Sequence, residues 1–188
     1  IASSLRSSQW QNRMKKYAPY LIIFAALLWS LDGLLRRNLY SLPPATIVLL
    51  EHLLGLAVLT PLLIKEFKHW LGLSSRTWYS VAAIALLGGT IGTIAYTAAL
   101  GGVNYISFSV VVLLQQLQPL FAIALAGLLL KEPITKRFLG LAVLALVAAY
   151  FVAFPERRVN VATGGGTALA ARWALAAAFS WGASTVLG

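Results

Sequence analysis

The sequence lacks cysteine and is poor in charge. Without a cysteine among its 188 residues, it can form no disulfide, thiol nucleophile or cysteine-ligated metal site. Charged residues make up 11% of the chain and hydrophobic residues 60%, and the mean hydropathy is +0.81. A water-soluble globule needs more polar surface than this composition supplies. The chain is therefore expected to lie in a lipid bilayer.

Acidic residues are especially scarce, because only five stand against 15 lysines and arginines, giving a formal net charge of +10. A nucleic-acid-binding protein gathers its basic residues on one folded surface, interleaved with aromatic side chains. Here they lie between long apolar runs, so no nucleic-acid partner is expected. Cytoplasmic loops of membrane proteins are enriched in lysine and arginine. A cytoplasmic N-terminus would place ten of the 15 basic residues inside.

Six apolar runs alternate with short polar segments, and each approaches the roughly 20 residues that a helix needs to cross a bilayer. The sequence therefore predicts an all-α polytopic membrane protein. The predicted transmembrane helices cover residues 17–35, 43–64, 78–100, 105–130, 137–154 and 173–188. Residues 1–16 are then a cytoplasmic tail and residues 156–172 an external loop. Because the sequence opens on Ile1 and its last run has no polar flank, we expect a fragment of a longer product.

One acidic residue, Glu51, lies well inside the second run, in TIVLLEHLLGLAVL. An ionisable group at mid-bilayer costs roughly 2.5–3.5 kcal/mol and usually faces a cavity or a partner. Glu51 is therefore a candidate for contacting a substrate. The alternative is a structural role, in which Glu51 is protonated or hydrogen-bonded to a neighbouring helix. His52 points about 100° away on a helix and is expected to be a packed, neutral side chain.

The fourth run carries three glutamines and a proline at its centre, in VVVLLQQLQPLFAIALAGLLLKE. Pro119 has no amide hydrogen, so the carbonyl of Gln115 loses its usual donor and the helix is expected to kink. Irregular backbone at membrane depth is tolerated only where it is buried in protein or lines a watery cavity. The proline therefore predicts such a place near the middle of the bilayer.

Two of these glutamines are expected to share a helix face. Gln115 and Gln118 are three residues apart, and steps of four lead back to Val111 and Ser107, so this face carries two amides and a hydroxyl. Gln116 lies off that face. One reading is that the amides join helices through hydrogen bonds worth about 0.6–2 kcal/mol each. The kink and the polar face together favour a substrate pathway.

The third run contains Gly88 and Gly92, a pair of small residues four apart that lets helix backbones approach closely. We expect tight packing there, although a moving contact between helices would use the same residues.

The last run repeats part of the first. Aligning AALLWSLDGLL (residues 25–35) with AAFSWGASTVL (residues 177–187) superposes Trp29 on Trp181. Five spans separate the two copies, and an odd number reverses the orientation. This arrangement is typical of the inverted-topology repeats of secondary transporters, and it makes Trp29 a candidate site residue.

The run from Pro119 to Gly140, PLFAIALAGLLLKEPITKRFLG, resembles the EamA-type repeat of the drug/metabolite transporter superfamily. The fourth span of that repeat carries a proline and ends in a short turn after a glutamate. Pro119, Glu132, Thr135 and Gly140 match this pattern in order.

The resemblance implies a ten-helix carrier of a bacterial-type inner membrane, built from two inverted five-helix repeats. Residues 17–155 would be the first repeat and residues 173–188 the truncated first helix of the second. Such carriers move small metabolites or drugs by alternating access, often as exporters, and coupling to protons is one option. Monomer and homodimer both stay open.

The chain departs from the family at Glu51, where family members often carry an arginine. An acid at this place favours a cationic or amine-bearing substrate, or serves as a protonation site. The candidate substrate-binding residues are Glu51, Gln115, Gln118, Trp29, Ser107 and Pro119.

Two other classes of function compete with a carrier. A membrane enzyme would need a nucleophile or metal cluster, but the sequence has no H-E-x-x-H, G-x-S-x-G or P-loop motif. No catalysis, cofactor or metal is therefore expected. A membrane scaffold or accessory subunit would need no cavity, so Gln115 and Gln118 replaced by cysteine would not react with aqueous thiol reagents.

Overall fold

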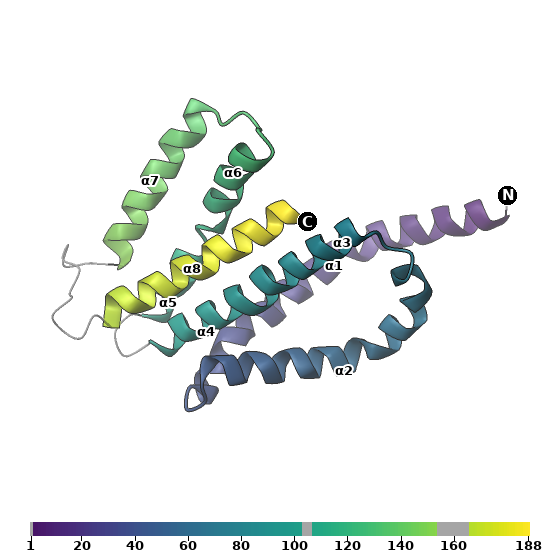
Figure 1. Cartoon of the computed structure of the whole chain (residues 1–188), viewed down its shortest axis with the longest axis horizontal. Coiled ribbons are helices and arrows are strands. Elements are labelled where there is room, and N and C mark those ends of the chain that lie inside the picture. Colours follow the sequence, from purple (N-terminus) through teal and green to yellow (C-terminus); the bar gives the residue numbers. More distant parts are fainter. Residues whose placement is uncertain (1, 103–106, 154–165) are drawn as a thin grey trace. The chain divides into compact units, whose positions relative to one another are not determined.

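The computed structural model describes residues 2–102, 107–153 and 166–188, and these are helical apart from short connections (Figure 1). The chain divides into two compact units, Ile1–Leu39 and Tyr40–Gly188. Each is described by itself.

The first unit consists of helix α1 (Ala2–Arg36) and a short 3₁₀ turn, Arg37–Leu39. The helix contains the apolar segment Tyr17–Gly33, which corresponds to the first predicted span. Asp32 and Arg36 are four residues apart, a spacing that predicts an ion pair on one helical face. Their Nε and Oδ2 atoms lie 2.7 Å apart, which confirms it.

The second unit contains the remaining helices. They are α2 (Pro44–Trp70), α3 (Ser75–Ile84), a π-helical segment (Ala85–Gly92), α4 (Thr93–Gly101), α5 (Phe108–Gln115), α6 (Gln118–Leu129), α7 (Lys136–Ala153) and α8 (Gly166–Leu187). Ala85–Gly92 is called the π-segment below. The helix predicted from Trp173 begins earlier, at Gly166, so the end of the predicted external loop is helical. The rest of that loop, residues 156–165, lies outside the described residues.

Among the residues that the structure describes, three helical stretches are long and apolar enough to cross a bilayer. They are Pro44–Phe67, Ser75–Gly101 and Phe108–Leu130. At most 22% of each apolar window is buried inside the structure, so most of their large apolar side chains face outward. Acyl chains solvate such a surface, because in lipid a helix satisfies its own backbone hydrogen bonds. The prediction of an all-helical polytopic membrane protein is therefore confirmed.

The core of the second unit forms around α8, which packs against α6, α4, the π-segment and α5. Figure 1 shows α8, in yellow, running alongside α3 and α4. The side chains that α8 buries are small, and five of them are alanines: Ala170, Ala171, Ala174, Ala177 and Ala178. Small side chains let helix backbones approach closely in membranes. This explains why α8 can contact α3, α4, α5, α6 and the π-segment at once.

A tight connection joins α6 to α7. Lys131, two residues after the end of α6, has a positive φ of 58°. The hydroxyl of Thr135 accepts a hydrogen bond from the amide of Phe138 at 3.2 Å. Such a side-chain acceptor satisfies one of the free amides at a helix N-terminus. Ile134 packs on Gly127, where a Cβ would lie 2.5 Å from Ile134 Cδ1.

Candidate functional site

The fourth span is interrupted where the sequence predicted a kink. Helix α5 ends at Gln115, and α6 restarts at Gln118 with Pro119 in its first turn. Between them the amide of Leu117 bonds to the carbonyl of Leu114 at 3.2 Å, a tighter turn than the α-helix makes. Pro119 offers no amide to the Gln115 carbonyl. The predicted kink is confirmed and is in fact a break of two residues.

A line of hydrogen bonds crosses from this break to α8. The side-chain amide of Gln115 donates to Gln118 Oε1 at 3.3 Å, and that of Gln118 donates to the Thr185 hydroxyl at 3.5 Å. The Thr185 hydroxyl then donates to the carbonyl of Trp181 at 2.9 Å. We call these four residues the polar chain. Each residue of the polar chain donates to the next, from Gln115 through Gln118 and Thr185 to the carbonyl of Trp181. The side-chain oxygen of Gln115 takes no part in these bonds.

The two hydrogen bonds that the glutamine amides donate in the polar chain are long. Protein N–H···O hydrogen bonds cluster near 2.9–3.0 Å, whereas these measure 3.3 and 3.5 Å. Gln115 exposes only 5% of its surface, while Gln118 is half-buried. A solute with hydrogen-bonding groups could therefore replace the weaker bonds at Gln118 at little cost, with Gln115 held in place behind it.

The other predicted members of this face are placed differently. Gln116 is exposed and off the face, as predicted. Val111 is fully buried, and Ser107 precedes the first turn of α5, exposed, with its carbonyl accepting from the amide of Val110. Eight residues, or about 12 Å of helix, separate Ser107 from Gln115. The structure therefore joins Gln115, Gln118 and Pro119, and leaves Ser107 apart from them.

Glu51 lies on α2, which packs against α4. It follows the buried residues Ile47 and Val48 by four and three positions and so shares their face, although it is itself exposed. The glutamines, by contrast, are on helices that pack against α8. That Glu51 and the glutamines contact one substrate stays a prediction.

His52 contacts the third span while remaining exposed. Its Nδ1 lies 2.8 Å from the carbonyl of Val48 and so donates to it, and a Cβ on Gly89 would lie 3.3 Å from its Nε2. The prediction that His52 is packed is therefore correct only in part, because the side chain makes these contacts but stays exposed. Trp29 belongs to the first unit, where 65% of its surface is exposed, and its role also stays a prediction.

The sequence reasoning missed a contact between α8 and the π-segment. Ser180 Oγ donates to the carbonyl of Leu87 at 2.7 Å, and Trp181 Nε1 donates to that of Gly88 at 2.8 Å. The Trp181 ring also lies 5.4 Å from that of Tyr96. The sequence comparison identifies Trp181 only as the repeat partner of Trp29, although the hydroxyl residues at positions 180, 184 and 185 indicate a polar side of α8.

Gly88 and Gly92 allow this contact. A Cβ on Gly92 would lie 2.6 Å from Trp181 Nε1, and one on Gly88 would lie 3.0 Å from Ser184 Oγ. Real Cβ atoms essentially never approach to 2.6 Å. The tight packing predicted for this glycine pair is confirmed.

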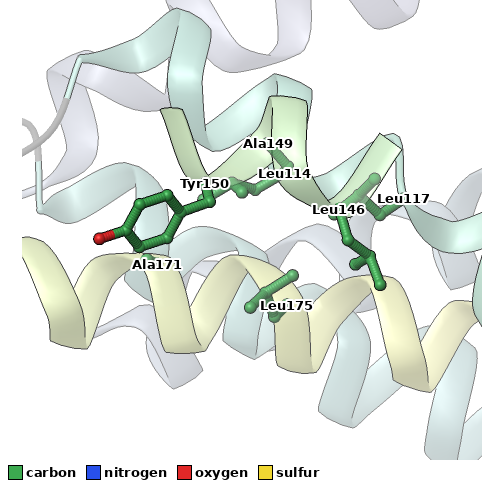
Figure 2. A pocket seen from close by; sticks show the side chains of 7 residues that line it. All are labelled: Leu114, Leu117, Leu146, Ala149, Tyr150, Ala171 and Leu175. Atoms are coloured by element: carbon green, nitrogen blue, oxygen red, sulfur yellow. The ribbon is translucent and has the colours of Figure 1, made fainter. Parts of the chain in front are cut away.

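In the part of the chain that the structure describes, two cavities lie between α5 and α7, and the first of them also borders α8. The first has a volume of about 140 Å³ and is lined by Leu114, Leu117, Leu146, Ala149, Tyr150, Ala171 and Leu175 (Figure 2). The second, of about 210 Å³, shares three of these residues and adds Gln116. Both linings are almost wholly apolar. Neither includes Gln115 or Gln118, so these cavities offer a polar solute few partners.

Across the residues that the structure describes, no group of three histidines or acids is placed to hold a metal ion.

Comparison with known proteins identifies relatives. The family model described as the EamA-like transporter family matches residues 16–154. The chain is also 38% identical over 170 residues to a protein of Fusobacterium nucleatum subsp. nucleatum named riboflavin transporter ImpX. The matched region is 89% of this chain and 57% of that relative, so the chain spans little more than half of its length. No solved structure matches the chain significantly.

Proposed function

Because the chain belongs to the EamA-like transporter family, we propose that it is part of a secondary carrier that moves a small solute across a membrane by alternating access. The family and the relative are transporters, so the prediction that the protein is an integral membrane transporter and not an enzyme is confirmed. For the same reason we favour transport of a small solute over the alternative function, that of a membrane scaffold or accessory subunit.

Riboflavin is the first solute to test, since the relative is named a riboflavin transporter. Riboflavin is a planar aromatic molecule with carbonyl and imide groups on one edge and a polyol tail. Amide side chains suit such groups, because each offers both a donor and an acceptor. Riboflavin carries no positive charge, so this proposal assigns Glu51 to proton coupling and not to binding an amine.

The proposed architecture is the ten-helix carrier of two inverted five-helix repeats. Two observations support it. The relative is longer than this chain, and the segment around Trp181 repeats the one around Trp29. In this arrangement the N-terminus is cytoplasmic and the membrane is a bacterial-type inner membrane.

The polar chain is the observation that carries the proposal for the site. Discontinuous helices near the middle of the membrane are where secondary transporters bind their substrates. In this chain the break between α5 and α6 lies within the apolar stretch Phe108–Leu130 and holds two linked amides. Gln115 and Gln118 are therefore the proposed solute contacts, and Pro119 maintains the break.

Thiol labelling tests this site directly, because the chain contains no cysteine. Gln118→Cys in reconstituted vesicles is expected to react with an aqueous thiol reagent, and riboflavin is expected to slow this reaction. Gln116→Cys is the matched control, since it lies two residues away and off the polar face, and riboflavin should not protect it. Equal protection at both positions, or no reaction at Gln118→Cys, would rule out the site.

A further inference from the structure

Side-chain hydrogen bonds show the hydrogen-bonding register of the π-segment. The hydroxyls of Thr90 and Thr93 donate to carbonyls five residues earlier, those of Ala85 and Gly88. In α4, which follows, the hydroxyl of Thr97 donates to a carbonyl only four residues earlier. The third span therefore changes from α to π register and back. Such segments are rare and are frequently found at functional sites.

Helix α8 supplies two hydrogen-bond donors to this segment. Ser180 and Trp181 donate to the consecutive carbonyls of Leu87 and Gly88 at 2.7 and 2.8 Å. These hydrogen bonds are far shorter than those that the two glutamines donate in the polar chain. A carbonyl oxygen can accept two hydrogen bonds, so the Leu87 carbonyl can bond to Ser180 and to the backbone at once. The Gly88 carbonyl accepts from Trp181 and from the Thr93 hydroxyl, which already makes two.

The same part of α8 also bears the polar chain. The Trp181 carbonyl accepts from Thr185, which in turn accepts from Gln118. Residues 180–185 of α8, less than two turns, therefore contact both the π-segment and Gln118. A solute that draws Gln118 away from Thr185 would change the contacts of these residues.

We propose that Ser180 and Trp181 are positioning residues for transport, which hold the third span in its π register in one of the two states of the carrier. This inference rests on the proposed function. When α8 withdraws the two donors, the segment returns to α register, and the Leu87 and Gly88 carbonyls bond to amides four residues later. Both registers satisfy the backbone, so the segment has two discrete arrangements.

The change of register would move α4. Removing one residue from a helical turn rotates the following helix by about 100° and shifts it by about 1.5 Å. Helix α4 carries Ala95, Tyr96 and Ala99, which are buried in the core of the second unit. A rotation of this size would bring different side chains against α8, which is a change of state and not a small adjustment.

Transport kinetics provide the first test. Trp181→Phe keeps an aromatic ring beside Tyr96 but loses the donor, and Ser180→Ala loses the other. The double variant is expected to lower the maximal rate of riboflavin transport per folded protein about tenfold or more, with KM changed less than about twofold. The single variants Ser180→Ala and Ser180→Thr are also compared. Ser180→Thr keeps a hydroxyl and should keep most of the wild-type rate, whereas Ser180→Ala should not. A residue that only stabilises the fold would lower the amount of folded protein and not this rate.

Hydrogen exchange provides a test that needs no transport. In the double variant the amides of the π-segment, Ala85–Gly92, are expected to exchange about tenfold faster. Without the two donors the segment changes register more often, and each change breaks its backbone hydrogen bonds. Gly101→Ala is the matched control on the same span, since nothing lies within 4 Å of the added Cβ. It should change neither exchange nor rate.

The two tests separate the proposals. Unchanged exchange in the double variant overturns the inference whatever the transport result. Faster exchange with an unchanged maximal rate overturns the role in transport. If the complete carrier that contains the chain moves no riboflavin, the proposed solute is wrong, while exchange still decides whether α8 holds the π register. Gly92→Ala gives a second variant on the opposite helix, because its Cβ would displace the Trp181 indole, and it should accelerate exchange in the same segment.

Discussion

Gly182 of α8 lies against the first turn of α6, where a Cβ on Gly182 would be 3.0 Å from the carbonyl oxygen of Gln118. The same Cβ would lie 3.0 Å from the amide nitrogen of Ala122. Both neighbours are backbone atoms, which cannot move aside as a flexible side chain can. The close approach of these helices is therefore what allows Thr185, one turn along α8, to reach the side chain of Gln118.

Gly182→Ala is expected to separate α8 from α6. Overpacking of this kind costs about 1–3 kcal/mol, and the hydrogen bond between Gln118 and Thr185, already 3.5 Å long, should be lost. The midpoint temperature of thermal unfolding in detergent and the rate of riboflavin transport should both decrease. Gly55→Ala is the control, because its Cβ would meet nothing within 4 Å. Equal stability of the two variants would show that the helices can part without cost.

Thr185→Val tests whether the polar chain contributes to solute affinity. Valine has nearly the shape of threonine but cannot accept from Gln118 or donate to Trp181. If the chain orients Gln118 for the solute, KM should rise about threefold to tenfold, the equivalent of one hydrogen bond of about 0.5–1.5 kcal/mol. The control is Thr60→Val on α2, whose hydroxyl bonds only to the carbonyl of Leu56 in its own helix. A KM that stays at the wild-type value would remove Thr185 from the site.

Local chemistry explains what the sequence could predict. Pro119 lacks an amide hydrogen in any fold, so the break beside Gln115 follows from the covalent structure alone. The spacing of Gln115 and Gln118 places their side chains together on any helix, and the structure links them by a hydrogen bond. Apolar runs likewise predicted the helices that cross the membrane, because only a helix satisfies its own backbone in lipid.

Contacts between distant residues explain what the sequence could not predict. The π register depends on donors from Ser180 and Trp181, which lie 93 positions from their acceptors. Hydropathy does not distinguish an α register from a π register, since the same apolar residues suit both. The apolar run predicted that the last span starts at Trp173, but α8 starts at Gly166, because a helix satisfies its own backbone and can extend past the apolar core.

The cavities beside α7 offer a test of packing. Ala149 lines both, which have volumes of about 140 and 210 Å³. Ala149→Leu should fill part of this space and raise the free energy of unfolding by about 0.5–2 kcal/mol, measured by thermal unfolding in detergent. Val143→Leu adds a methylene on the exposed side of the same helix and should have no such effect. If Ala149→Leu lowers stability, the space is needed by a neighbour or a lipid tail.

Glu51→Gln tests proton coupling. Glutamine keeps the size and hydrogen-bonding capacity of the side chain but cannot exchange a proton. If Glu51 carries the coupled proton, riboflavin movement driven by a pH gradient should fall at least about tenfold, while exchange of labelled for unlabelled riboflavin without a gradient continues. Vesicles loaded with riboflavin, compared with empty vesicles placed in riboflavin, also test the predicted export.

Glu66→Gln is the matched control for this prediction, because Glu66 lies on the same helix, α2, fifteen residues further along. Its replacement should leave gradient-driven movement unchanged. A loss of both gradient-driven movement and exchange in Glu51→Gln would indicate instead that the carboxylate supports the fold or binds the solute. Full retention of gradient-driven movement would exclude Glu51 from coupling.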